Sequence, residues 1–141
     1  MKKKDNFRQN KKKSLNTAKG RNAEETARKF LINNDIRILE KNYFTRFGEI
    51  DLIGLKKNLI IFIEVKYRQN NKYGHGSEVI GWRKKQAIKK AALNYLAENE
   101  NNFNEIRFDL IEIINNKKII NPEKNMVIKW TKNILQFDDN V

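Results

Sequence analysis

Two apolar segments that contain charged residues, 48–53 and 60–66, constrain the fold of this chain most. β-Branched and aromatic residues dominate both segments, which is typical of strands, and the short polar stretch between them predicts a tight turn. Alternate residues of a strand share a face, so Asp51 on the first strand is expected to face Glu64 and Lys66 on the second. A buried charge is costly unless it is paired or binds a metal. These embedded charges therefore indicate the candidate functional site.

Hydrophobic periodicity predicts the elements around these two strands. Apolar residues at helical spacing predict helices over residues 18–33 and 82–98. Further strands are predicted over residues 36–44, 106–114 and 126–130, with a short packed element over 131–141. Short connections make the first three strands an antiparallel meander, whereas the strand, helix, strand order that follows predicts a parallel crossover. The expected fold class is α/β, a mixed central sheet flanked by helices in the order α-β-β-β-α-β.

Charge points to an anionic partner. The chain has 141 residues, which suits one domain, and a net charge of +13. Residues 1–13 supply +6 of that charge, so +7 remains in the rest of the chain. We expect a disordered basic arm over residues 1–19 and one domain over residues 20–141. Nucleic acid is the leading partner and an anionic membrane the alternative.

Missing sequence features exclude other classes of protein. No apolar run is long enough to span a bilayer and the basic N-terminus lacks a signal-peptide core, so we expect a soluble cytoplasmic protein without a membrane partner. The chain has no Cys and a single His, His75, which lies between two glycines and is expected to be structural or solvent-facing instead of catalytic. No phosphate-binding glycine motif is present. A hydrolytic centre would therefore consist of carboxylates and lysines, which suits Mg²⁺ or Mn²⁺.

Asp51 and Glu64 are the candidate metal ligands, and the Val65 carbonyl is a further one. A divalent ion stabilises charge on a phosphodiester and lowers the pKa of bound water. Lys66 is placed to orient the attacking water or to stabilise charge on the phosphate. The alternative is a structural salt bridge between Asp51 and Lys66 that contributes only ~0.2–1 kcal/mol. The residues alone leave both interpretations open.

Cations gather next to this candidate site. Arg83, Lys84 and Lys85 occupy the first turns of the second predicted helix, where they are unfavourable with the helix dipole unless an anion binds there. Arg68 lies in a basic and aromatic segment, 67–81, that is predicted to be a loop able to contact phosphates or bases. We predict that these four cations bind nucleic acid, and an ordinary solvated surface is the alternative.

The order Asp51, Glu64, Lys66 resembles the PD-(D/E)xK signature of restriction-endonuclease-like nucleases, with Ile50 at the position of the signature's proline. From about Gly20 to about Phe137 the chain looks like the YraN-like family of predicted bacterial endonucleases. The segments that carry this resemblance are Gly48-Glu49-Ile50-Asp51-Leu52-Ile53, Phe62-Ile63-Glu64-Val65-Lys66-Tyr67-Arg68, Lys84, Ala91-Ala92, Tyr95-Leu96 and Arg107-Phe108-Asp109.

The resemblance implies a restriction-endonuclease-like core and a metal-dependent endonuclease acting on DNA, with branched or junction DNA as one substrate class. It implies that Asp51, Glu64 and Lys66 occupy the metal and water-activating positions. Glu24 matches the helix acid that related Holliday-junction resolvases use near the metal, whereas helix geometry alone favours a solvated acid. A homodimer is a further expectation, since resolvases make paired cuts. The alternatives are a non-catalytic basic nucleic-acid-binding protein and a protein-interaction subunit.

Overall fold

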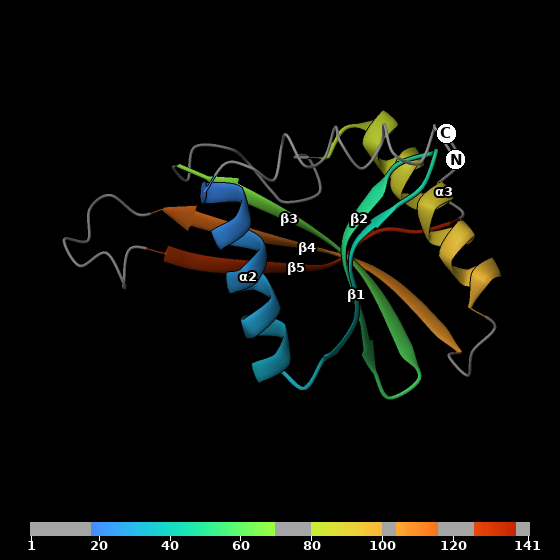
Figure 1. The fold of residues 1–141 in the computed structure, drawn as a ribbon, viewed down its shortest axis with the longest axis horizontal. Helices are drawn as coiled ribbons and strands as arrows, with labels where there is room; N and C mark the ends of the chain where they lie inside the picture. Colours follow the sequence, from blue (N-terminus) through green and yellow to red (C-terminus); the bar gives the residue numbers. More distant parts are fainter. Residues whose placement is uncertain (1–17, 70–79, 100–103, 116–125, 138–141) are drawn as a thin grey trace.

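The structure, a computed structural model, describes residues 18–69, 80–99, 104–115 and 126–137. Its elements follow the predicted order, including a last strand that begins at residue 126 (Figure 1). They are α2 (Ala18–Asn33), β1 (Arg37–Phe44), β2 (Glu49–Lys56), β3 (Leu59–Arg68), α3 (Trp82–Glu98), β4 (Glu105–Asn115) and β5 (Met126–Leu135). The α/β fold with a mixed sheet and two helices is confirmed, and it is consistent with a restriction-endonuclease-like core. His75 and residues 1–17 of the predicted arm lie outside the described residues.

The five strands form one sheet in the order β1-β2-β3-β4-β5. β1, β2 and β3 make the predicted antiparallel meander, and β4 pairs parallel to β3 after α3. This parallel pairing continues to the last residue of β3, where Arg68 is in register with Ile114. Tyr67 and Arg68 are therefore strand residues, and the prediction that a loop begins at residue 67 is wrong. The ladder with β4 extends the strand because backbone pairing does not depend on the polarity of these side chains.

β5 is longer than the sequence predicts. It runs past residue 130 to Leu135, which pairs with Phe108 of β4. A register shift between Phe108 and Leu110 interrupts the alternation of side chains, and Asn133 on β5 has a positive φ of 58°. Such an irregularity breaks the period-2 pattern from which strands are predicted. Residues 131–135 therefore belong to the sheet instead of forming a separate element.

Asp109 holds β4 and β5 together at this irregularity. Its carboxylate is fully buried, and it accepts hydrogen bonds from Arg107 Nε and Nη2, both at 2.8 Å. It also accepts the Trp130 indole N–H at 2.9 Å and the Asn133 backbone N–H at 3.0 Å. Four donors satisfy the buried charge. The Arg107-Phe108-Asp109 segment of the sequence therefore has a structural role that the resemblance did not specify.

The two helices cover opposite faces of the sheet, as the alternation along β3 shows. Ile60 and Phe62 belong to the core cluster that contains the apolar residues of α3, including Ile88. Ile61 and Ile63 belong to the cluster that contains those of α2. A strand buried on both faces requires a continuous apolar run, which is what residues 59–63 provide. The charged residues Glu64, Lys66 and Arg68 therefore interrupt a strand whose first five residues are all apolar.

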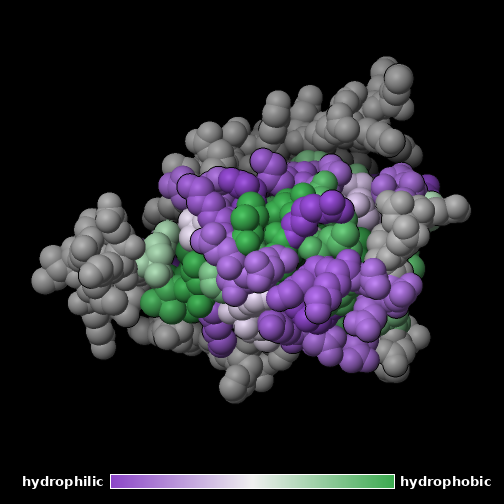
Figure 2. Space-filling model, turned by 90° about the horizontal axis from the view of Figure 1, so that it is seen from below, coloured by the Kyte–Doolittle hydropathy of each residue, from purple (hydrophilic) through white to green (hydrophobic). Residues whose placement is uncertain are grey.

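Hydrophilic side chains cover much of the outer surface. The face drawn in Figure 2 is largely hydrophilic, with smaller hydrophobic areas between the charged side chains. Within the part of the chain that the structure describes, no helix has the length and apolar character needed to cross a membrane.

Candidate active site

The candidate site lies where strands β2 and β3 separate. Their ladder of backbone pairs runs from Lys56↔Leu59 to Leu52↔Ile63, and Asp51 and Glu64 come directly after this last pair. The Asp51 carboxylate replaces the missing ladder contact, because its Oδ2 accepts the Val65 backbone N–H at 2.9 Å. Both acids are buried, with 4% and 6% of their surface exposed. The two strands thus bring together the two carboxylates that the sequence singles out.

Helix α3 adds a cation to this pair. Lys84 Nζ lies 3.5 Å from Glu64 Oε1, and Lys66 Nζ lies 3.9 Å from the same oxygen. The two lysine side chains are 35% and 40% exposed, so their ammonium groups are open to solvent while the carboxylate is not. The arrangement places two partly exposed ammonium groups beside a buried carboxylate.

A second buried ion pair lies beside the first on the same face of the sheet. Arg68 Nε lies 2.6 Å from Glu112 Oε2, and their side chains are 11% and 2% exposed. Glu112 is in register with Lys66 on the neighbouring strand, so it shares the face of Glu64. The sequence analysis missed Glu112, although it interrupts an apolar strand just as Glu64 does. A phosphate that binds Arg68 would have to compete with this carboxylate.

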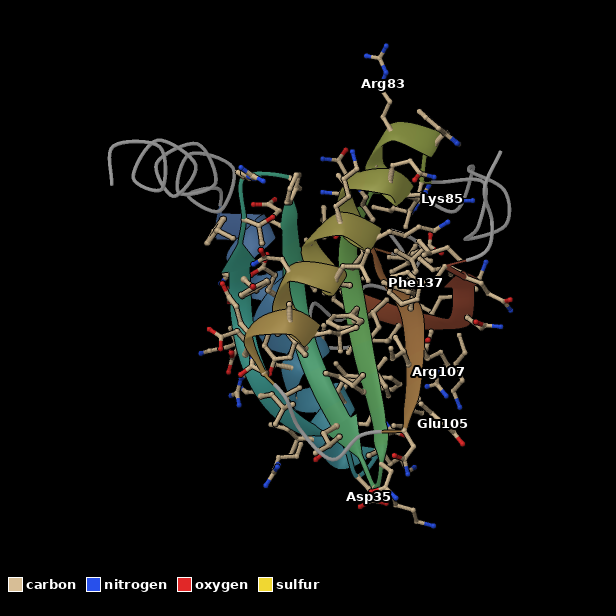
Figure 3. The ribbon with its side chains drawn as sticks, turned by 90° about the vertical axis from the view of Figure 1, so that its right-hand side faces the viewer. Asp35, Arg83, Lys85, Glu105, Arg107 and Phe137 are labelled. Atoms are coloured by element: carbon tan, nitrogen blue, oxygen red, sulfur yellow. The ribbon has the colours of Figure 1, made fainter. Side chains whose placement is uncertain are left out.

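The other predicted cations lie at the start of α3. Arg83 is exposed, and Figure 3 shows it extending from the N-terminal end of α3 away from the sheet, with Lys85 nearer to the body of the molecule. Lys85 is half-buried. Because Lys84 in the same turn contacts Glu64, these cations lie next to the site. Their contact with nucleic acid stays a prediction.

Glu24 lies on α2, whose apolar stripe packs against the face of the sheet opposite to α3. Among the described residues, no group of three or more His, Cys, Asp or Glu is arranged to hold a metal ion. Glu24 therefore does not complete a three-carboxylate cluster with Asp51 and Glu64. Its action near a metal stays a prediction that rests on the resemblance alone.

The donor set still fits one divalent ion. Asp51 and Glu64 are two buried carboxylates on adjacent strands, and Val65 between Glu64 and Lys66 has a backbone carbonyl. Oxygen donors of this kind suit Mg²⁺, which is usually held by one or two carboxylates and keeps several waters. The neighbouring lysines offset the charge of Glu64. A site with two carboxylates is therefore enough for Mg²⁺ or Mn²⁺.

Fold and cluster together define a small basic α/β protein with a nuclease-like core and a carboxylate and lysine site between β2, β3 and α3. The chain belongs to the uncharacterised protein family UPF0102, whose family model matches residues 23–113. That range contains every residue of the cluster, Glu112 included.

Three relatives illustrate the similarity. A UPF0102 protein of Natranaerobius thermophilus is 45% identical over 106 residues, which are 74% of this chain and 89% of the relative. One from Fusobacterium nucleatum is 38% identical over 120 residues, covering 85% and 92% of the two chains. One from Clostridioides difficile is 41% identical over 110 residues, covering 78% and 96%.

Proposed function

We propose that this protein is a divalent-metal-dependent endonuclease that hydrolyses phosphodiester bonds in DNA, including branched or junction structures. The observation that carries the proposal is the pair of buried carboxylates, Asp51 and Glu64, at the point where two strands separate, with Lys66 beside them. Buried charge of this kind is costly, and it is retained where it has a function.

Asp51 and Glu64 would hold Mg²⁺ or Mn²⁺, with the Val65 carbonyl as a further oxygen donor. The bound ion would supply Lewis acidity and a lowered pKa for a bound water. The Val65 N–H fixes the Asp51 carboxylate through a hydrogen bond to its Oδ2. Glu64 is held from the solvent side by the two lysines.

Lys66 is the water-side residue of the proposed site. Its ammonium group is 3.9 Å from Glu64 and 40% exposed, so it can turn between the carboxylate and a phosphate. In that position it would orient the attacking water or stabilise the negative charge that develops on phosphorus. Lys84, which is also partly exposed beside Glu64, would bind the adjacent phosphate together with Arg83 and Lys85.

DNA is the proposed substrate because the charge of the chain matches a polyanion. The net charge is +13, and α3 presents Arg83, Lys84 and Lys85 in one turn beside the site. Phosphate contacts of this kind position a nucleic acid without reading its sequence. A dimer with two active sites would make the paired cuts that junction DNA requires.

The proposal is tested by incubating the purified chain with linear, flapped and four-way DNA in the presence of Mg²⁺ or Mn²⁺. We expect cleavage of at least one substrate, a loss of ~10²-fold or more in Glu64→Gln and Lys66→Met, and no cleavage with EDTA. The matched control is Glu25→Gln on α2, which removes an exposed acid paired with Arg28 at 2.6 Å. Salt-sensitive binding without cleavage of any substrate would favour the non-catalytic nucleic-acid-binding protein and overturn the proposal.

A further inference from the structure

Two aromatic side chains are unusually exposed on the side of the molecule that carries the start of α3. Trp82, the first residue of α3, is 62% exposed, and Phe47, before β2, is 40% exposed. Large aromatic side chains bury 150–250 Å² when they pack, so exposure on this scale leaves apolar area unused by the fold. Neither residue has a part in the proposed metal site.

Phe47 is held against α3 by its neighbours. A Cβ added at Gly48 would lie 2.9 Å from the Ala87 Cβ, so the turn before β2 touches the helix at this residue. The Phe47 ring has the Lys90 ammonium 5.9 Å from its centroid and the Arg46 guanidinium 4.6 Å from it. Phe47 thus lies beside the middle of α3, with Lys90 of the helix and Arg46 of the turn before β2 near its ring.

Trp82 and Lys90 are eight residues apart, a little more than two helical turns, so they differ by about 80° around the axis and lie on the same half of α3. At the helical rise this separates them by about 12 Å. Trp82, Phe47 and the cations Arg46, Arg83 and Lys90 together form what we call the aromatic and cation surface.

The electrostatics of this surface favour a polyanion. α3 contains five Lys and Arg residues and no acidic residue before Glu98 at its last position. Lys84, in the same first turn as Trp82, contacts Glu64 of the candidate site at 3.5 Å. The aromatic and cation surface therefore begins in the first turn of α3, whose opposite side carries Lys84 of the candidate site, and it continues along the helix.

We infer that the aromatic and cation surface binds single-stranded DNA, with bases stacked on Trp82 and Phe47 and phosphates on Arg46, Arg83 and Lys90. Stacking platforms beside cations are how proteins bind single strands without sequence preference, since every base has a π-face. The bases of a duplex are stacked on each other and do not offer this contact. This inference rests on the proposed function for its placement of DNA, and it specifies the substrate as DNA with unpaired nucleotides beside the cleaved bond.

The inference is tested by binding alone, in the Glu64→Gln chain with EDTA, so that a failure of cleavage does not decide it. A fluorescein-labelled oligothymidylate and a duplex of equal length are compared by anisotropy. We expect Trp82→Ala and Phe47→Ala each to weaken single-strand binding by about 5- to 150-fold, the range found for one base and one aromatic ring. Duplex binding should change by less than about twofold, because phosphate contacts dominate it.

Two further variants separate stacking from apolar contact. Trp82→Phe keeps an aromatic face and should retain most of the single-strand affinity, whereas Trp82→Leu should lose as much as Trp82→Ala. The matched control is Leu93→Ala, because Leu93 is 54% exposed on the same side of α3 and has no aromatic ring. Its affinity should equal that of the parent chain.

Three results would overturn the inference. One is unchanged single-strand affinity in both Trp82→Ala and Phe47→Ala. Another is an equal loss for single strand and duplex, which would leave no preference for unpaired bases. The third is a Trp82→Ala chain whose mass by light scattering falls from a dimer to a monomer, since the aromatic side chains would then join two copies of the chain.

Discussion

Replacement of Asp51 separates its structural role from its proposed catalytic one. The Asp51 carboxylate accepts the Val65 N–H at 2.9 Å at the position where the β2 and β3 ladder has ended. Asp51→Asn keeps an acceptor oxygen for this N–H but removes the negative charge that would bind a metal. Asp51→Ala removes both. If Asp51 has both roles, Asp51→Ala will be less stable than Asp51→Asn, and both variants will have lost DNA cleavage.

The expected magnitudes come from the burial of this bond. A hydrogen bond to a charged acceptor contributes ~1.5–3 kcal/mol, and a buried donor left without a partner costs ~1–3 kcal/mol. Asp51 is 4% exposed, so water does not readily replace it. We expect Asp51→Ala to lower the free energy of unfolding by ~1–3 kcal/mol and Asp51→Asn by less than ~1 kcal/mol. Relief of repulsion between Asp51 and Glu64 favours both variants equally and does not change this difference.

The assay is urea unfolding followed by circular dichroism, together with DNA cleavage in Mg²⁺. With a denaturant slope of ~1–3 kcal/mol per M, the unfolding midpoint of Asp51→Ala should fall by roughly 1 M. Both variants should be inactive at a temperature where both are folded. Cleavage by Asp51→Asn at the parent rate would refute the metal-ligand role. Equal destabilisation of the two variants would refute the structural role of the bond to Val65.

Four other outcomes test separate parts of the structure. Gly54→Ala should lower the free energy of unfolding in urea by ~1–3 kcal/mol, because the added Cβ would lie 2.5 Å from Ile36 Cγ2 in the core. A loss within the error of the measurement would contradict this. Asp109→Ala should lose ~3–5 kcal/mol, since it leaves the half-buried Arg107 guanidinium and two N–H donors without their acceptor. A mild effect would show that β5 is held by other contacts. Burial raises the pKa of Tyr43 to about 12, so the neutral phenol stabilises the fold fully below the unfolded pKa of about 10, and this contribution is lost as the pH rises through 12. Burial also raises the pKa of Tyr95. Ultraviolet titration should therefore show late-titrating tyrosines, of which one is absent from Tyr43→Phe. Mg²⁺ or Mn²⁺ at about ten times its Kd should raise the free energy of unfolding of the parent chain by ~1.4 kcal/mol, measured by thermal unfolding, and should leave that of Glu64→Gln unchanged. An equal increase in both chains would place the ion elsewhere.

The fold could be predicted from the sequence because its signals are local and periodic. Both helices begin and end at the predicted residues, since each has one uninterrupted apolar stripe. The central strands were found because β3 is apolar on both faces. β5 was predicted only as far as residue 130, because the irregularity at Asn133 interrupts the alternation and the strand is held there by Asp109 of β4. That contact joins residues that are far apart in the sequence.

The candidate site was predictable in part for the same reason. Asp51 and Glu64 could be found because they interrupt apolar strands, and Glu112 could have been found by the same rule. The partners of these acids could not be derived from spacing. Lys84 contacts Glu64 because α3, the helix that connects β3 to β4, packs over the sheet. Arg68 pairs with Glu112 because β4 is the parallel neighbour of β3. The sequence shows which residues carry charge, whereas the order of strands decides which charges meet.

The pairing of charges at the site bears on how it would hold both the proposed ion and the proposed DNA. Asp51, Glu64, Lys66 and Lys84 carry two negative and two positive charges, so the cluster is neutral without a metal. Lys84 lies 3.5 Å from Glu64 and its side chain is 35% exposed, so its ammonium group can move into solvent when another cation binds the carboxylate. A divalent ion on the carboxylates would bring the cluster to a charge of +2 and release both lysines towards the phosphate. The ion and the DNA should therefore each strengthen the binding of the other, because the charge that the ion adds is the charge that the phosphate neutralises.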